Sequence, residues 1–271
     1  MRAPDPLTRL LARRNSQENG PIALMYHSIT PGDRIPSWPW SISIGQFREH
    51  LDYLVSEGYA TATVHDLVGT EAKHQEKTAV ITFDDGYADN LAAVEELQIR
   101  GMRATWYVVT GSIGQPPAWF DDGGPSGRLL SADELRTMKR AGMEIGSHTV
   151  SHAKLTALGA AELMQELLAS RATLEDLLGD TVTSFAYPYG LWSEACESAV
   201  RAAGYLSACT TRTGWAIRDR NPYRVRRLAV FNQDSTSRFV RKLIFASDDV
   251  GWSQIAGYWG RRLGARLKGG A

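Results

Sequence analysis

Two short stretches of this sequence carry residue types that suit metal-assisted hydrolysis. Asp84 and Asp85 lie in Thr-Phe-Asp-Asp-Gly-Tyr, residues 82–87, and His148 and His152 lie in His-Thr-Val-Ser-His, residues 148–152. Each stretch ends an apolar, strand-like run. One carboxylate and two imidazoles leave a coordination position open for water, which is the ligand set of a catalytic zinc site or a similar divalent-metal site. The adjacent carboxylate is then free to transfer a proton.

These motifs, in this order, resemble the signature of the polysaccharide deacetylases, carbohydrate esterase family four. Residues 185–190, Phe-Ala-Tyr-Pro-Tyr-Gly, look like the third motif of that family. The similarity runs from about Ile22 to about Val230, and the combination of Thr-Phe-Asp-Asp-Gly with His-Thr-x-x-His is highly specific. The resemblance implies a metal-dependent deacetylase.

The resemblance also implies a role for each matching residue. Asp85, His148 and His152 match the metal ligands, with zinc as the first choice by ligand type and cobalt or nickel as substitutes. Asp84 matches the general base, and Tyr189 matches the position whose backbone N–H stabilises the developing oxyanion. The alternatives are that Asp84 is a further metal ligand or a turn-capping side chain, and that the turn at Tyr189 only ends a strand.

Two positions depart from the usual pattern of the family. Ala186 stands where the third motif commonly has an Arg that orients the base, and the strand end at residues 228–230, Leu-Ala-Val, lacks the usual catalytic His. We predict that Arg227 steadies Asp84 instead, although a surface or ion-pair role for this arginine is equally open.

A replacement for the missing histidine is present near the N-terminus. Residues 24–29, Leu-Met-Tyr-His-Ser-Ile, look like the opening of a family branch that includes poly-N-acetylglucosamine deacetylases, whose members supply the acid from the N-terminal strand. His27 is therefore the expected proton donor to the departing amine, provided that its neighbours raise its pKa. The alternative is a histidine that only forms a hydrogen bond at the rim of the barrel.

Strand and helix patterns alternate along the chain. Apolar runs predict strands over residues 22–27, 79–83, 104–109, 144–147, 183–187, 205–209 and 225–230, and helical spacing predicts helices over residues 44–56, 88–100, 132–141 and 160–178. Ser131 followed by Glu134 indicates a capping box, and Gly179 marks a helix end. Alternation of this kind favours an α/β fold with parallel strands. The resemblance sharpens this to a distorted, incomplete (β/α) barrel.

Composition limits the kinds of partner. The 271 residues are compatible with one large domain, and we place a polar N-terminal tail at 1–20, a catalytic domain at 21–245 and an aromatic, basic C-terminal tail at 246–271. Lysine and arginine together number 30, as do aspartate and glutamate, so no global field attracts nucleic acid, and a neutral substrate fits this balance. Cys196 and Cys209 lack metal-type spacing and are expected to be buried free thiols.

The two terminal segments of the sequence indicate where in the cell the protein is expected to lie. Residues 1–20 contain no apolar stretch typical of a secretory signal, so we expect a cytoplasmic protein. The C-terminal segment has apolar residues at helical spacing and several basic ones, so it could lie on an anionic membrane surface, although docking on the barrel is the favoured alternative. These residues are Trp252, Ile255, Trp259 and Leu263, with Arg261, Arg262, Arg266 and Lys268.

Aromatic residues in predicted loops suit the apolar faces of sugar rings. They are Trp38 and Trp40, and Trp119 in the long loop from Gly111 to Leu130, which is a candidate rim of the active site. Anchoring of the loops is the alternative role of these rings. Three histidines without suggestive spacing are expected to be structural or exposed, namely His50, His65 and His74.

The expected function is hydrolysis of N-acetyl groups on the amino sugars of a glycan, glycolipid or glycan precursor. Two alternatives remain. The same site could hydrolyse O-acetyl groups or other amides, or the chain could be a catalytically silent glycan-binding domain, since the usual third-motif Arg is absent.

Overall fold

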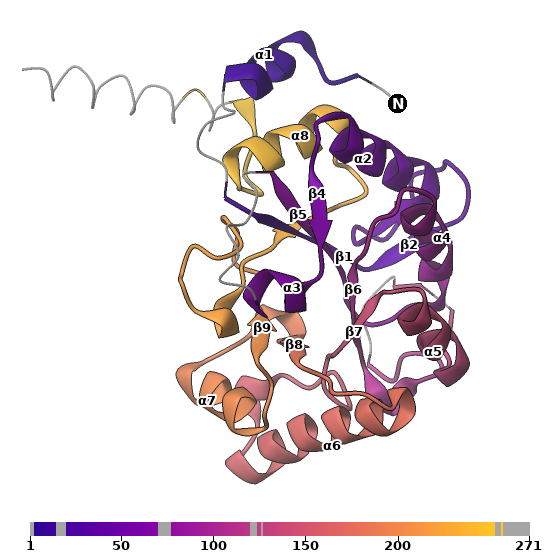
Figure 1. Ribbon diagram of the computed structural model, residues 1–271, viewed down its shortest axis with the longest axis vertical. Coiled ribbons are helices and arrows are strands. Elements are labelled where there is room, and N and C mark those ends of the chain that lie inside the picture. Colours follow the sequence, from indigo (N-terminus) through magenta and orange to yellow (C-terminus); the bar gives the residue numbers. More distant parts are fainter. Residues whose placement is uncertain are drawn as a thin grey trace, which may run out of the picture.

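A curved sheet of parallel strands forms the centre of the protein (Figure 1). The computed structural model describes residues 3–14, 20–69, 77–119, 124–125, 127–252 and 256. Along the sheet the strand order is β10-β1-β5-β6-β7-β8-β9, and β4 adds to β5. The bounds are β1 Ile22–Tyr26, β4 Ala60–Ala62, β5 Thr78–Phe83, β6 Thr105–Val108, β7 Glu144–Ser147, β8 Ser184–Ala186, β9 Ser207–Cys209 and β10 Leu228–Ala229. A separate pair joins β2, Ser28–Thr30, to β3, Ser41–Ser43.

The last strand segment of the chain lies between the two sides of the curved sheet. Leu228 pairs with Leu24 of β1, and three residues earlier Val225 bridges to Cys209 of β9, both in parallel orientation. Residues 225–229 therefore contact both β1 and β9, which curls the sheet into a distorted barrel. The predicted α/β fold with parallel strands is confirmed.

Helices cover the outside of this sheet (Figure 1). α2, α4 and α5 lie on one side, α6 and α7 lie below them in the figure, and α8 and α1 lie at the top. Their bounds are α1 Pro6–Arg14, α2 Ile44–Ser56, α3 Val64–Gly69, α4 Leu91–Ile99, α5 Ala132–Arg140, α6 Ala160–Leu178, α7 Glu194–Ala202 and α8 Thr236–Phe245.

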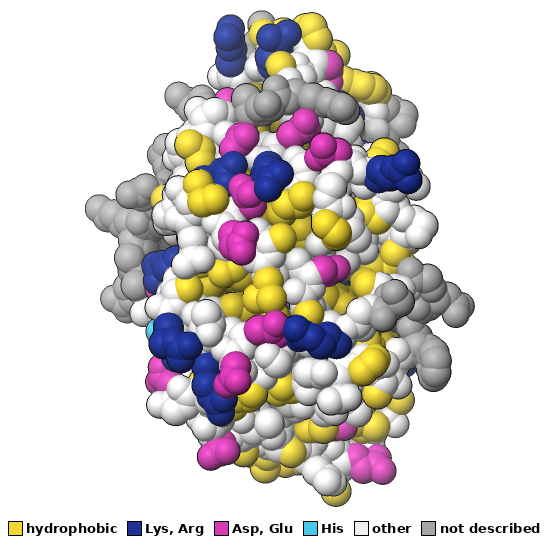
Figure 2. Space-filling view, turned by 90° about the vertical axis from the view of Figure 1, so that its right-hand side faces the viewer, with side chains coloured by type: hydrophobic (Ala, Val, Ile, Leu, Met, Phe, Trp, Pro, Cys, Tyr) yellow, Lys and Arg dark blue, Asp and Glu magenta, His cyan; other side chains and the backbone are white. Residues whose placement is uncertain are grey.

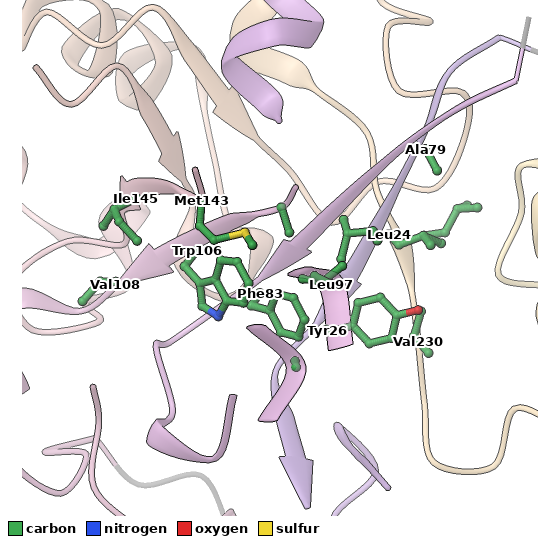
Figure 3. Packing of buried hydrophobic residues seen from close by; sticks show 14 of the residues in the cluster. Leu24, Tyr26, Ala79, Phe83, Leu97, Trp106, Val108, Met143, Ile145 and Val230 are labelled. Atoms are coloured by element: carbon green, nitrogen blue, oxygen red, sulfur yellow. The ribbon is translucent and has the colours of Figure 1, made fainter. Parts of the chain in front are cut away.

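Aromatic rings from neighbouring strands fill the space between the sheet and the helices. Phe83 of β5 stacks on Trp106 of β6, with ring centroids 4.5 Å apart and an interplanar angle of 6°, and on its other side it stacks on Tyr26 of β1 (Figure 3). All three side chains are fully buried. The strands that carry the candidate site are thus fixed by one continuous core.

The end signals of the helices are confirmed. α2 and α6 begin and end at the predicted residues. Ser131 and Glu134 form the capping box of α5, and Gly179 ends α6 in the left-handed conformation, with φ of 65°. These signals are local, because they depend on the free N–H and C=O groups at a helix end.

Several short elements were absent from the sequence-based prediction. α1 lies within the segment expected to be a polar tail, and it packs on α8, where the backbone N–H of Asp5 donates to Ser237 Oγ at 2.8 Å. Its buried side is narrow and is formed by Thr8 and Leu11, which explains why hydropathy did not reveal it. Cys196 and Cys209 are free and buried, as expected. Residues 70–76, which include His74, and residues 253–255 and 257–271 of the C-terminal tail lie outside the described residues.

Candidate active site

The predicted site residues gather around one cavity of about 420 Å³. His27 follows β1, Asp84 and Asp85 follow β5, and His148 follows β7. Parallel strands bring these carboxyl ends to the same edge of the sheet, which is the catalytic face of barrel enzymes. The full lining is Met25, His27, Trp38, Trp40, Asp84, Asp85, His148, His152, Tyr189, Gly190 and Thr211. Arg227 contacts the site from beneath, through Asp84.

Asp85, His148 and His152 form a compact group that could hold a metal ion. One ligand atom from each lies within 4.8 Å of the others, and all three side chains are buried. Asp85 Oδ1 lies 3.5 Å from His148 Nε2 and 3.4 Å from His152 Nε2. One carboxylate oxygen facing two imidazole nitrogens fits the donor set of a catalytic zinc ion.

Hydrogen bonding favours the metal-binding tautomer of His148. Its Nδ1 lies 2.8 Å from the carbonyl oxygen of Ala186, so this nitrogen carries the proton and the Nε2 lone pair faces Asp85. Burial lowers the pKa of His148, and burial together with His148 lowers the pKa of His152 to about 2. Both imidazoles are therefore neutral, which is the state that binds a metal.

The backbone around these ligands is held in a sparsely populated conformation. Six non-glycine residues of the described chain have positive φ, and four of them belong to this site: Asp85 at 71°, Thr149 at 71°, His152 at 58° and Tyr189 at 58°. Such residues cost free energy and persist only where surrounding contacts hold them. Here the backbone N–H of His152 donates to Thr149 Oγ1 at 2.9 Å.

The loop between the two histidines is fastened to α6. One carboxylate oxygen of Glu166 accepts hydrogen bonds from the backbone N–H groups of Val150 and Ser151, at 2.8 and 3.0 Å, and the other accepts from Ser151 Oγ at 2.7 Å. α6 thus fixes the turn that lets His148 and His152 point at the same carboxylate.

Asp84 contacts different groups from those that surround Asp85. Arg227 donates to both of its carboxylate oxygens, at 2.5 and 2.8 Å, and also to Thr82 Oγ1 and to the carbonyl oxygen of Thr210. Both members of the ion pair are buried. Burial alone would raise the pKa of Asp84, but the charge and hydrogen bonds of Arg227, together with His148 and His27, outweigh it and lower the pKa to about 2. The carboxylate is therefore ionised and oriented.

His27 lies on the opposite side of the cavity among aromatic rings. Its ring is 4.7 Å from that of Trp40 and 6.0 Å from that of Trp38. Burial lowers the pKa of His27 to about 4, because the attraction of Asp84 is too weak to compensate. The condition that its neighbours raise this pKa is not met at rest, and the role of His27 as proton donor stays a prediction.

The rim of the cavity contains the aromatic residues picked out in the sequence. Tyr189 and Trp119 flank His152, with ring centroids 4.4 and 4.7 Å from the imidazole, and the Tyr189 side chain is exposed. Gly190 is required at its position, because a Cβ there would lie 1.9 Å from Thr211 Oγ1. Trp38 is buried, so anchoring is part of its role. Of the other described histidines, His50 is buried and His65 is exposed.

Sequence reasoning missed the residues that hold His27 through its backbone. Asn90 Nδ2 donates to the carbonyl oxygen of His27 at 2.8 Å, and Asn90 Oδ1 accepts from the Trp106 indole at 3.2 Å. Asp89 accepts from Ser28 Oγ at 2.6 Å. The available signal was the position of both residues in the sequence. They follow shortly after Asp-Asp-Gly and therefore lie near the same edge of the sheet.

Comparisons with known proteins identify relatives of this chain. The family described as polysaccharide deacetylase matches residues 71–208, just over half of the chain. YxkH of Bacillus subtilis (strain 168), which is named after the polysaccharide deacetylases, is 31% identical over 222 residues, covering 80% of this chain and 73% of that protein. The poly-beta-1,6-N-acetyl-D-glucosamine N-deacetylase of Staphylococcus aureus (strain MSSA476) is 21% identical over 252 residues, covering 83% of each chain.

Solved structures show the same fold. IcaB from Ammonifex degensii superposes with a TM-score of 0.70 at 23% identity, covering 85% of this chain and 98% of that one. The Streptococcus pyogenes deacetylase PplD in complex with acetate gives 0.69 at 22% identity, covering 80% and 95%. With the extent of the family match and the identity to YxkH, these findings show that the chain belongs to the polysaccharide deacetylase family of hydrolases.

Proposed function

We propose that this protein is a metal-dependent hydrolase that removes N-acetyl groups from the amino sugars of a glycan, glycolipid or glycan precursor. The observation that carries the proposal is the juxtaposition, in one cavity, of the Asp85, His148 and His152 group with the buried pair of Asp84 and Arg227. The similarity to a poly-beta-1,6-N-acetyl-D-glucosamine N-deacetylase supports the choice of an N-acetylated saccharide.

Asp85, His148 and His152 would hold the metal ion, with zinc first by ligand type and cobalt or nickel as substitutes. When bound, the ion supplies Lewis acidity toward a carbonyl oxygen and toward water. The protein contributes a rigid ligand set, because Ala186 fixes one imidazole and α6 fixes the loop that carries the other.

Asp84 is the proposed general base. It takes a proton from water as the oxygen attacks the acetyl carbon, and its bidentate pair with Arg227 keeps the carboxylate ionised and correctly turned. Arg227 thereby takes over the orienting task of the arginine that Ala186 replaces. The backbone N–H of Tyr189 is the proposed donor to the oxyanion.

His27 is the proposed proton donor to the amine nitrogen when the carbon–nitrogen bond breaks. Because burial keeps this imidazole neutral at rest, it must take up a proton during the reaction before it can donate one. Acetate and a free amine are the products. Trp38, Trp40 and Tyr189 offer uncharged aromatic surfaces beside these groups, and such surfaces suit the faces of a sugar ring.

Measurement of acetate release tests the proposal. Purified protein, with and without added zinc, is screened against N-acetylated and O-acetylated saccharides, and Asp84→Asn serves as the inactive variant. We expect zinc-dependent release from N-acetylated saccharides. Release from O-acetylated substrates alone would replace the proposal with an esterase, and saccharide binding without any release would replace it with a glycan-binding domain.

The location of the protein stays a prediction. None of the helices in the described part of the chain has the length and apolar character needed to cross a bilayer. Fractionation of producing cells would test both the expected cytoplasmic location and the expected peripheral contact of the C-terminal tail with a membrane.

A further inference from the structure

The two ends of the described chain meet at Arg241 of α8. The Arg241 guanidinium donates to Thr8 Oγ1 at 3.1 Å and to Asp5 Oδ2 at 3.3 Å, which fastens α1, and to the carbonyl oxygen of Val250 at 3.1 Å. It also lies over the ring of Trp252, 4.5 Å from the centroid. The segment that leads into the C-terminal tail is therefore held beside α1.

The outward side of α1 combines apolar and basic side chains. Leu7 and Leu10 are 50% and 46% exposed although the helix is packed on the protein, and Arg9 and Arg13 are exposed beside them. Trp252 is 42% exposed. We call these five residues the terminal surface. At the top of the molecule in Figure 2, where Figure 1 places α1, basic side chains lie next to hydrophobic ones.

The sequence concentrates positive charge near both ends of the chain. The nine residues of α1 include three arginines and no acidic residue. From Val250 to Ala271 the chain has four basic residues and again no acidic one. Because the whole chain has a formal net charge of +0, the remainder of the protein is correspondingly negative. The charge is thus strongly asymmetric, with the positive end at the chain termini.

We propose that the terminal surface binds an anionic lipid bilayer. Leucine and tryptophan side chains at a helix surface enter the region between headgroups and acyl chains, while arginines meet lipid phosphates. A soluble polyanion such as a nucleic acid would use the arginines but would leave Leu7 and Leu10 in water. The exposed leucines therefore favour the bilayer. None of the five residues lines the catalytic cavity, so the proposal is independent of the proposed function.

Vesicle cosedimentation tests the proposal with the full chain. The protein is incubated with vesicles of phosphatidylcholine alone and with vesicles of an equal mixture of phosphatidylcholine and phosphatidylglycerol. We expect binding to the mixed vesicles that weakens as salt is added, because the basic residues contribute through charge. Equal affinity for both vesicles, or no binding to either, overturns the proposal.

Paired variants separate the apolar contribution from the charge. Leu7→Ser with Leu10→Ser should weaken binding to the mixed vesicles by about tenfold or more, because two partly exposed leucine side chains lose their apolar transfer energy. Leu168→Ser with Leu206→Ser is the matched control, since these leucines are 49% and 54% exposed elsewhere in the chain, and it should bind like the wild type. If the Leu7 and Leu10 variant binds as the control does, the surface is not a lipid surface.

Charge variants complete the test. Arg9→Gln with Arg13→Gln should weaken binding to mixed vesicles by about 30-fold, since each basic residue near an anionic membrane contributes about 1 kcal/mol. Arg136→Gln with Arg140→Gln on the exposed side of α5 is the control. Loss of binding only when the tail residues are replaced would confine the contact to the tail and overturn the role of α1. Acetate release from a soluble substrate should be unchanged in every variant.

Discussion

The two sides of the catalytic cavity hold their functional groups by different means. On the polar side, Asp84 and His148 are fixed through their side chains, by Arg227 and by the carbonyl oxygen of Ala186. On the aromatic side, the His27 ring is surrounded by tryptophans, and its Nδ1 has no hydrogen-bond partner among the described residues. Asp84 and His148 are thus oriented by directional bonds, whereas His27, the imidazole expected to move a proton, is held by ring packing and is neutral.

Loss of a ligand on the polar side should have the largest effect. His148→Ala removes one of three proposed ligands and leaves a buried carboxylate facing a single imidazole, so we expect loss of most bound metal and a fall in acetate release of more than about 100-fold. Elemental analysis of the purified variant measures the metal. His65→Ala, which changes an exposed histidine, is the control and should keep the metal. Undiminished metal in His148→Ala would refute the ligand assignment.

The two adjacent carboxylates on the polar side should differ in what their substitution removes, turnover in one case and metal binding in the other. Asp84→Asn should keep the metal and lose about 10²–10⁴-fold of turnover, which is the usual contribution of a general base. Asp85→Asn should instead weaken metal binding, because its oxygen faces both imidazoles. Metal titration and acetate release on both variants provide the comparison. Equal loss of metal from the two would make Asp84 a ligand.

On the aromatic side, the effect of His27→Ala should depend on the leaving group. An amine must be protonated as it departs, whereas the phenolate of an aryl acetate leaves without a proton, so the variant should lose about 10²–10⁴-fold on the N-acetylated saccharide and much less on the aryl ester. Rates on both substrates are measured alongside metal content and thermal stability. Equal losses on the two substrates, with reduced metal or stability, would assign His27 a structural role only.

The smallest expected effect concerns a second imidazole held by packing. His50 stacks on Phe239 at 3.9 Å, its Nδ1 lies 3.2 Å from Tyr26 Oη, and burial together with the charge of Lys242 lowers its pKa to about 3. Lys242 is itself paired with Asp234. The folded state therefore binds fewer protons than the unfolded state between the pKa of about 3 and the reference value of about 6.5.

Stability should accordingly be full above about pH 6.5 and should fall as the pH is lowered toward 3. His50→Gln removes the titration, so its free energy of unfolding should depend less steeply on pH in this window. Urea unfolding of chelator-treated wild type and variant measures the difference. Identical slopes would show that His50 is not buried neutral.

The polar side was easier to predict from the sequence than the aromatic side. Asp85, His148 and His152 occupy strand ends within two short motifs, so local pattern and parallel topology together place them at one edge. The contact of Arg227 with Asp84 was one of two open alternatives, because it depends on a pairing across 143 residues that no local signal reports. The neutral state of His27 could not be read from sequence, since it results from burial of the ring in the folded protein.

The fold shows the same division between local and distant information. α2, α5 and α6 have capping groups and apolar spacing of their own, so their bounds followed from the sequence. α1 escaped prediction because its position depends on Arg241 and Ser237 of α8, at the other end of the chain.

Arg227 lies in the segment between β1 and β9, which is synthesised late. The proposed hydrolysis therefore depends on synthesis of this segment. The partner of Asp84 is made last, 143 residues after it, and it arrives with the strand that closes the barrel. A nascent chain that stops before residue 225 would carry every proposed metal ligand but would leave Asp84 without its cation and the edges of β1 and β9 unpaired. We therefore expect ribosome-bound intermediates to bind metal before they can hydrolyse anything, so that activity marks a finished domain.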